Sequence, residues 1–259
     1  MKEFSIDFIQ ELQARNEALF WSGVLMFLGA AVTGGLIFLT DQKVLGINAW
    51  IKPTKFFLSA GIFVWTLGWL LYELRSPIQV QWFSWAVIAI MFFELIYITW
   101  KAGLGDLSHF NTSSAFHANM FTLMGAAIMF MTAWTAYIGL LFFVKDLSHL
   151  PEAYVWGIRL GITLFVIFAM EGAVMGRQLA HTVGAPDGGE GLPVVNWSKQ
   201  HGDLRIAHFF GMHALQILPL AGYYVIESKW GILLFSLAYL AFVSFTLWQA
   251  LQGRPFLGL

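Results

Sequence analysis

The sequence predicts an all-α, polytopic membrane protein: a bundle of seven transmembrane helices preceded by an N-terminal interfacial helix. Composition is the first reason, because 58% of the 259 residues are hydrophobic and only 11% are charged, whereas soluble domains carry about 25% charged residues. The second is that the apolar residues form seven stretches, each close to the ~20 residues that a helix needs to cross a bilayer. The third is that no polar stretch is long enough for a soluble domain.

The elements follow from the N-terminus onward. Residues 1–18 are too acidic for a signal peptide, and Phe4, Phe8 and Leu12 recur at helical spacing, so we expect an amphipathic helix at the membrane interface. Residues 19–259 are expected to form a single transmembrane domain. Within it, residues 184–199 begin with GAPDGGEGLP, which indicates a flexible loop and possible lid. The predicted spans are Leu19–Leu39, Thr54–Leu74, Trp82–Trp100, Phe116–Val144, Val155–Gln178, Leu204–Ile226 and Trp230–Leu251.

Seven spans place the termini on opposite sides: side A holds the N-terminus and side B the C-terminus. Lys and Arg divide almost evenly between the sides, so the positive-inside rule leaves orientation open in the bacterial-type inner (cytoplasmic) membrane that we expect. The net charge of −1 argues against nucleic acid as a partner, and the absence of Cys excludes disulfides and thiolate metal sites. Histidine is strongly asymmetric, because six of the seven belong to side B: His109, His117, His181, His201, His208 and His213.

Polar residues inside the spans fall on helical stripes that run toward side B. In the third span Glu94 and Tyr97 share a face with Lys101, and in the fifth span Glu171 shares a face with His181. Ionisable groups at such depth are costly in lipid and usually mark functional sites. The sequence therefore predicts a polar pocket that opens to side B and narrows to a cluster of carboxylates and imidazoles.

We expect this pocket to bind a transition metal ion, zinc or iron, because imidazole nitrogen and carboxylate oxygen are ligands of both. The predicted metal ligands are Glu171, His213 and His117, and Glu94 and His208 are predicted completing ligands or acid–base groups. His208 and His213 are five residues apart, so on a regular helix their directions differ by about 140° and only one can join Glu171. The expected activity is that of a metal-dependent hydrolase or oxidoreductase with a lipophilic substrate.

An alternative cofactor is haem b. The best axial pair for it is His117 with His208, and Lys52, Lys55 and Arg205 would bind its propionates. In the metal hypothesis the same three cations bind an anionic head group of the substrate.

A third interpretation is a proton- or ion-coupled transporter that uses Glu94, Glu171 and His213 as a relay. Against it, the sequence shows no inverted repeat. A sensor or scaffold is compatible with seven spans but has no residue in its favour. Retinal binding is disfavoured, because the seventh span contains no lysine. The lipid bilayer is a partner in every case, and the sequence leaves the oligomeric state open.

About a dozen residues resemble membrane-embedded hydrolases of the alkaline ceramidase type. Those enzymes also have seven spans, with a Ser and a His near one end and a later helix with two histidines. The matching residues here are Ser113 or Ser114, His117, and the His208/His213 pair. The chain departs from that pattern in two ways, since four residues instead of three separate the pair and no residue matches the family's aspartate. The resemblance implies a membrane-embedded hydrolase.

Overall fold

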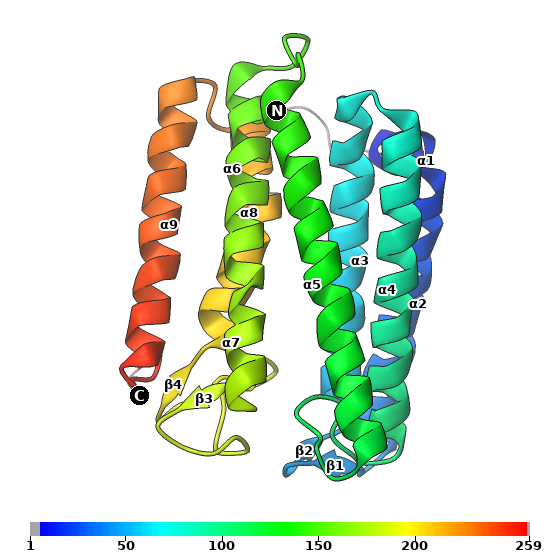
Figure 1. Cartoon of the computed structure of the whole chain (residues 1–259), viewed down its shortest axis with the longest axis vertical. Coiled ribbons are helices and arrows are strands. Elements are labelled where there is room, and N and C mark those ends of the chain that lie inside the picture. The colour runs from blue at the N-terminus through cyan, green and yellow to red at the C-terminus, as the bar shows by residue number, and fades with distance from the viewer. Residues whose placement is uncertain (1–5, 258–259) are drawn as a thin grey trace. The chain divides into compact units, whose positions relative to one another are not determined.

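The computed structural model describes residues 6–257, and most of this range is helical (Figure 1). Phe4 of the expected interfacial helix lies outside the described residues. The chain divides into two compact units, Met1–Met131 and Thr132–Leu259, which we call unit 1 and unit 2 and describe separately. The expectation of a single transmembrane domain stays a prediction.

Unit 1 contains the first four helices and the beginning of the fifth. A short hairpin connects α2 to α3, with Leu45 and Gly46 in the left-handed backbone region between its strands. The elements are α1 (Ile6–Arg15), α2 (Glu17–Leu39), β1 (Lys43–Val44), β2 (Ile47–Asn48), α3 (Ile51–Leu71), the 3-10 turn η1 (Tyr72–Leu74), α4 (Pro77–Gly103) and α5 (Ala115–Val144), which continues into unit 2.

Unit 2 contains the rest of α5 and the remaining helices. The fifth predicted span lies within Glu152–Gln178, which consists of two helices that meet at Met170, and two short strands pair near the start of α8. The elements are α6 (Glu152–Ala169), α7 (Glu171–Gln178), β3 (Thr182–Val183), β4 (Gly202–Asp203), α8 (Arg205–Tyr224) and α9 (Lys229–Leu251).

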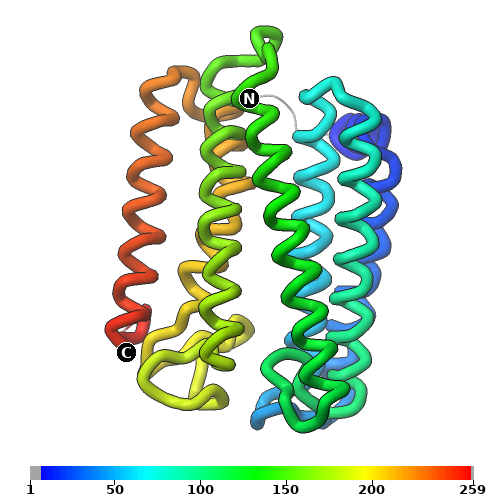
Figure 2. The backbone as a smooth tube through the Cα atoms, in the orientation of Figure 1, coloured from blue at the N-terminus to red at the C-terminus, as the bar shows by residue number. Residues whose placement is uncertain are grey.

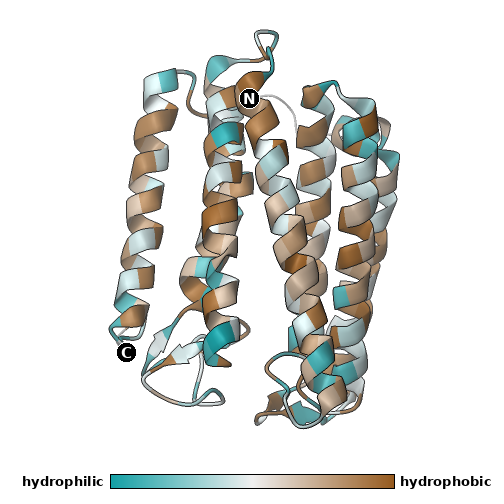
Figure 3. Cartoon of the chain, viewed as in Figure 1, coloured by the Kyte–Doolittle hydropathy of each residue, from teal (hydrophilic) through white to brown (hydrophobic). Residues whose placement is uncertain are grey.

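Within residues 6–257, six helical stretches are long and apolar enough to cross a membrane, so the chain is an integral membrane protein. They are Glu17–Leu39, Ile51–Leu74, Pro77–Gly103, Ala115–Val144, Glu152–Gln178 and Lys229–Leu251. Hydrophobic residues cover the middle of these helices and hydrophilic ones gather toward the ends (Figure 3). The remaining predicted stretch, Leu204–Ile226, forms α8, which is 20 residues long but carries His208, His213 and Gln216 and is not among the six.

Glycines bring the backbones of α6 and α8 into close contact. A Cβ atom on Gly157 would lie 2.5 Å from the carbonyl oxygen of Leu218, and one on Gly161 would lie 2.8 Å from that of Ala214. Because α6 runs opposite to α8, these contacts repeat along the whole interface. Small residues allow such close approach between helices in lipid, where apolar burial gives little net attraction. The resulting core of unit 2 is completed by Val243 of α9.

The amphipathic helix α1 packs against the end of α3. Leu12 is fully buried, Phe8 stacks on Trp69 with ring centroids 5.0 Å apart, and Arg15 forms an ion pair of 2.5 Å with Glu73. The Arg15 guanidinium also lies 4.2 Å from the Trp69 ring centroid. Helix α1 is therefore held against the end of α3 and against η1 by packing as well as by charge.

The predicted loop 184–199 is folded back on itself between β3 and β4 (Figure 2). The amide of Leu192 donates to the carbonyl of Trp197 over 2.8 Å, and Gly191 pairs with Ser198 in a bridge. The Trp197 ring contacts Phe209 of α8 at a centroid distance of 5.6 Å. This segment is thus attached to the helix that carries the candidate histidines.

The α6–α8 contact predicts a difference between two glycine substitutions. Gly157→Ala forces a methyl group against a backbone carbonyl, so the helices must separate, at a cost of about 1–3 kcal/mol. Gly35→Ala in α2 meets no atom within 4 Å and improves helix propensity, so it serves as the matched control. Thermal unfolding in detergent should show a lower midpoint for the first variant only. Equal midpoints would contradict the close packing.

Candidate functional site

The candidate residues divide between the two units. Lys52, Lys55, Glu94 and His117 belong to unit 1, while Glu171, Arg205, His208 and His213 belong to unit 2. Among residues 6–257, no three His, Asp or Glu side chains are arranged closely enough to share a metal ion. The geometry is therefore described within each unit.

In unit 1 the predicted stripe on α4 faces inward. Glu94, Tyr97 and Lys101 are 5%, 3% and 1% exposed, which confirms that they share a buried face. The Oε1 atom of Glu94 and the hydroxyl of Tyr97 are buried and have no hydrogen-bond partner. Lys52 of α3 is the positive charge that acts on Glu94. This buried face of α4 therefore carries more polar atoms than the surrounding residues satisfy with hydrogen bonds.

At the end of this stripe, five side chains form a closed ring of hydrogen bonds. Lys101 donates to Asp106 and to Nε2 of His117, 3.1 Å away. Because that nitrogen accepts, Nδ1 of His117 carries the proton and donates over 2.9 Å to Ser113. Ser113 donates over 2.7 Å to Asn111, whose amide donates over 3.1 Å to Asp106. The ring ties the loop between α4 and α5 to the buried end of α4.

The ring uses both nitrogens of His117. To act as a metal ligand, His117 would have to give up its bond to Lys101 or to Ser113. In this arrangement Ser113 also accepts the imidazole proton, which is opposite to the direction that a nucleophilic serine needs. The hydrogen bond from Lys101, helped by that from the Leu107 amide, holds the pKa of Asp106 below its usual value, so Asp106 is a carboxylate acceptor.

The other unit 1 candidates lie on α3, near the same loop. Lys52 Nζ is 3.3 Å from Nδ1 of His109, and the Ser108 hydroxyl is 3.2 Å from that nitrogen. Lys55 is partly buried and lies one helical turn further along α3. A phosphate or carboxylate group of a ligand that binds Lys52 would therefore also lie close to the imidazole of His109.

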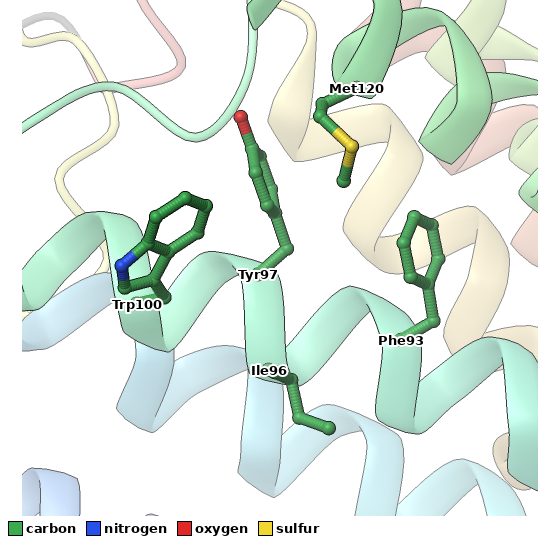
Figure 4. A pocket seen from close by; sticks show the side chains of 5 residues that line it. All are labelled: Phe93, Ile96, Tyr97, Trp100 and Met120. Carbon is green, nitrogen blue, oxygen red and sulfur yellow. The ribbon is translucent and has the colours of Figure 1, made fainter. Parts of the chain in front are cut away.

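An apolar cavity of about 260 Å³ lies along the same part of α4 (Figure 4). Its walls are Phe93, Ile96, Tyr97 and Trp100 of α4 and Met120 of α5. The Tyr97 ring stands between this cavity and the polar stripe, because Glu94 and Lys101 lie on its other side around the helix. The cavity suits a ring or a short apolar chain, and no charged group lines it.

In unit 2 the most unusual group is Glu171, the first residue of α7. It is 6% exposed, and neither carboxylate oxygen has a hydrogen-bond partner. The negative charge that acts on it is Asp203 of β4, which is fully buried. An isolated buried carboxylate is costly. Glu171 therefore needs a partner that the described residues do not supply.

Of the two histidines on α8, His208 is the one that contacts the junction of α6 and α7. Its Nδ1 lies 2.8 Å from the carbonyl oxygen of Phe168, and a Cβ on Gly172 would lie 3.4 Å from its Cε1 atom. His213 lies on another face of α8, where Nδ1 is 3.0 Å from Gln216 Oε1. Because α8 is a regular helix, the two histidines point in different directions from it, as their spacing in the sequence predicts.

His181, between α7 and β3, is fixed by Asp187. Its Nδ1 is 2.7 Å from Asp187 Oδ2, and the amides of His181 and Thr182 also donate to this carboxylate. Burial tends to raise the pKa of Asp187, but the hydrogen bonds and charge of His181 outweigh burial and bring the pKa well below its usual value. His181 also acts electrostatically on His208.

Arg205 is committed to a neighbour within unit 2. Its guanidinium forms hydrogen bonds of 2.9 and 2.6 Å with the two oxygens of Asp203 and one of 2.5 Å with the carbonyl of Asn196. Asp203 also accepts from the amide of Ser198. A head group or propionate would have to compete with Asp203 for Arg205.

Four groups in these clusters escaped the sequence analysis. Asp106 and Asn111 complete the ring of unit 1, and Asp187 fixes His181. The only sequence signal was the concentration of polar residues in the two loops, which does not say which pairs form. The carbonyl of Phe168 leaves no signal, because every residue has one.

No protein-family model, curated protein or solved structure matches this chain. The function of this chain is therefore inferred from its own residues.

The ring in unit 1 predicts an acid-dependent difference between Asp106→Asn and the wild type. A carboxylate with a depressed pKa stabilises the fold above its unfolded pKa, and this contribution is lost as the pH falls through the folded pKa. Near pH 7 the substitution should cost about 1 kcal/mol, because Asp106 is partly exposed while Lys101 is buried.

The measurement is the difference in thermal midpoint between wild type and variant as a function of pH. The difference should be largest at neutral pH and should shrink in acid. Asp41→Asn, on an exposed loop, is the matched control and should have a smaller effect. A difference that grows toward low pH would rule out the assigned role of Asp106.

Proposed function

We propose that this chain is an integral membrane metalloprotein with enzymatic activity toward a lipophilic substrate, and that Glu171 is a ligand of its zinc or iron ion. The observation that carries the proposal is the buried Glu171 carboxylate, both of whose oxygens lack a partner. An ionisable group inside a span is a functional candidate by default, and a cation is the partner that satisfies both oxygens.

The substrate class is supported by the setting of the candidate groups. Lys52, Lys55, Glu94, His117 and Glu171 lie on helices long and apolar enough to cross a membrane, where lipophilic molecules would have direct access from the bilayer. In unit 1, the cavity next to the α4 stripe is lined by apolar and aromatic side chains, as small-molecule sites commonly are. Either a hydrolase or an oxidoreductase is compatible with zinc or iron chemistry.

The finer topology is part of the same proposal. We propose α8 as a seventh span, because it is as long as a bilayer requires and packs along α6 through glycines. We also propose that α1 lies along the interface, as its buried Leu12 and exposed polar face favour. A bacterial-type inner membrane, with orientation open, completes this proposal.

Of the other predicted roles, acid–base work by Glu94 fits a buried carboxyl group with an unpartnered oxygen. His208 is proposed as a ligand or acid–base group in unit 2, because its ring lies against Gly172, the residue that follows Glu171. Lys52 and Lys55 are proposed to bind an anionic part of the substrate. His213, in the same unit as Glu171, stays a candidate for completing the coordination, and the role of His117 as a ligand stays a prediction from the sequence.

A proton- or ion-coupled transporter is the second candidate. It is favoured by Glu94 in unit 1 and Glu171 in unit 2, since each is a buried carboxyl group with an unpartnered oxygen in a different unit. A transporter needs such groups to exchange protons or ions during the cycle.

Elemental analysis and an optical spectrum of the purified protein separate these candidates. We expect close to one zinc or iron per chain, no Soret band, and loss of most of that metal in Glu171→Gln. Glu227→Gln, an exposed acid in the same unit, is the control and should keep the metal. A Soret band would select haem b. A metal-free protein with proton-dependent flux in liposomes would select the transporter.

A further inference from the structure

We propose that unit 2 binds the phosphate group of an anionic phospholipid through Arg159, Lys229 and Trp156. These residues lie where α5 ends and where α6 and α9 begin, which is the same end of unit 2 (Figure 1). The lipid site is separate from Glu171, which lies beyond the other end of α6, and it requires no metal ion.

Arg159 is fixed at this end of unit 2 by one of its nitrogens. It lies about 10 Å along α6 from the first residue of that helix, Glu152. Side chains on a helix tilt toward its N-terminus, so the guanidinium is directed back toward the start of α6. There its Nε donates over 2.8 Å to the carbonyl oxygen of Phe142. This carbonyl is one of the last four of α5, which have no partner within their own helix.

The rest of the Arg159 guanidinium is available for a ligand. Its Cζ lies 5.1 Å from the ring centroid of Trp156 and 5.4 Å from that of Phe143, so two aromatic rings flank it. Within residues 6–257, no carboxylate pairs with Arg159 and its terminal nitrogens have no hydrogen-bond partner. A charged group inside a span is costly without a partner. Phosphate fits this position because two of its oxygens can accept parallel hydrogen bonds from a guanidinium.

Lys229, the first residue of α9, adds a second positive charge to the site. Its Nζ lies 5.3 Å from the ring centroid of Trp156, the ring that Arg159 also contacts. The same Nζ is 3.2 Å from Oε1 of Glu152, whose side chain is largely exposed. Two cations beside Trp156 are thus matched by one ion-paired carboxylate. The remaining positive charge favours a lipid with a net negative charge, such as phosphatidylglycerol, over zwitterionic phosphatidylcholine.

Exposed aromatic rings around these cations indicate a lipid as the source of the phosphate. Trp230 is 77% exposed and lies 6.0 Å from Lys229 Nζ, and Phe143 is 44% exposed. Tryptophan is enriched at the level of the head groups, where its ring contacts both lipid and water. The stretches that begin with α6 and α9 are long and apolar enough to cross a membrane. A bilayer phospholipid would therefore place its phosphate at the cations and its glycerol and acyl chains against the rings.

The test is native mass spectrometry of the purified full-length protein in detergent, titrated with phosphatidylglycerol or with phosphatidylcholine of the same acyl chains. We expect the Kd of the wild type for phosphatidylglycerol to be at least about tenfold lower than for phosphatidylcholine. Arg159→Gln should raise the Kd for phosphatidylglycerol at least about tenfold, because it removes charge-assisted hydrogen bonds. Lys229→Gln should raise it by a smaller factor, because Glu152 already neutralises part of that charge.

Arg254→Gln is the matched control, since Arg254 is an exposed arginine just beyond the other end of α9. This variant should bind phosphatidylglycerol like the wild type. Arg159→Gln also removes the hydrogen bond to Phe142, so its thermal midpoint without added phosphatidylglycerol shows whether it folds. Lys229→Gln keeps that hydrogen bond, and its weaker lipid binding would support the site even if Arg159→Gln did not fold.

Three results would overturn the proposal. Equal affinity of the wild type for the two lipids would show that negative charge is not recognised. Unchanged binding of phosphatidylglycerol in Lys229→Gln and in folded Arg159→Gln, or equally weakened binding in Arg254→Gln, would show that this cluster is not the site. Displacement of phosphatidylglycerol by millimolar inorganic phosphate would assign the site to a free anion instead of a lipid.

Discussion

The close contact between the α6 and α8 backbones is the constraint on which the candidate site in unit 2 depends. Gly157 and Gly161 let carbonyl groups of α8 approach where any side chain would push them away. This contact sets the register of the two helices, and the register places the imidazole of His208 at the carbonyl of Phe168. The hydrogen bond in turn fixes the tautomer of the ring. A packing feature without chemistry of its own thus decides which nitrogen of His208 carries the proton.

The ring around Lys101 in unit 1 and the carboxylate of Glu171 in unit 2 are opposite cases of buried polar groups. In unit 1, Lys101 and His117 belong to a ring in which every donor has an acceptor, as a low-dielectric setting requires. In unit 2, Glu171 is as deeply buried but has no partner on either oxygen. A satisfied network stabilises the loop that it joins, whereas a buried carboxylate without a partner lowers the free energy of unfolding. A group that lowers stability in this way is a candidate for a functional role. The contrast is why the metal proposal concerns unit 2.

The positions of the helices can be predicted closely from the sequence, because a long apolar stretch is a strong indication of a membrane-spanning helix. The break at Met170 cannot be, since Met170 keeps right-handed helical backbone angles and no proline marks it, and it is what separates Glu171 from α6. The shared face of Glu94 and Lys101 was predictable from spacing alone. The bond between His181 and Asp187 was not, because it depends on how a glycine-rich loop turns back on itself.

A proton on Glu171 is the simplest rival to a metal ion. A protonated carboxyl group has an O–H donor that must find an acceptor, and His208 Nε2 is an acceptor in the same region. Such a pair would show a hydrogen bond between the two side chains, yet neither oxygen of Glu171 has a partner. A proton also leaves the second oxygen of Glu171 without a partner. A divalent cation would accept electron pairs from both oxygens at once, so a single ligand would account for the isolation of Glu171.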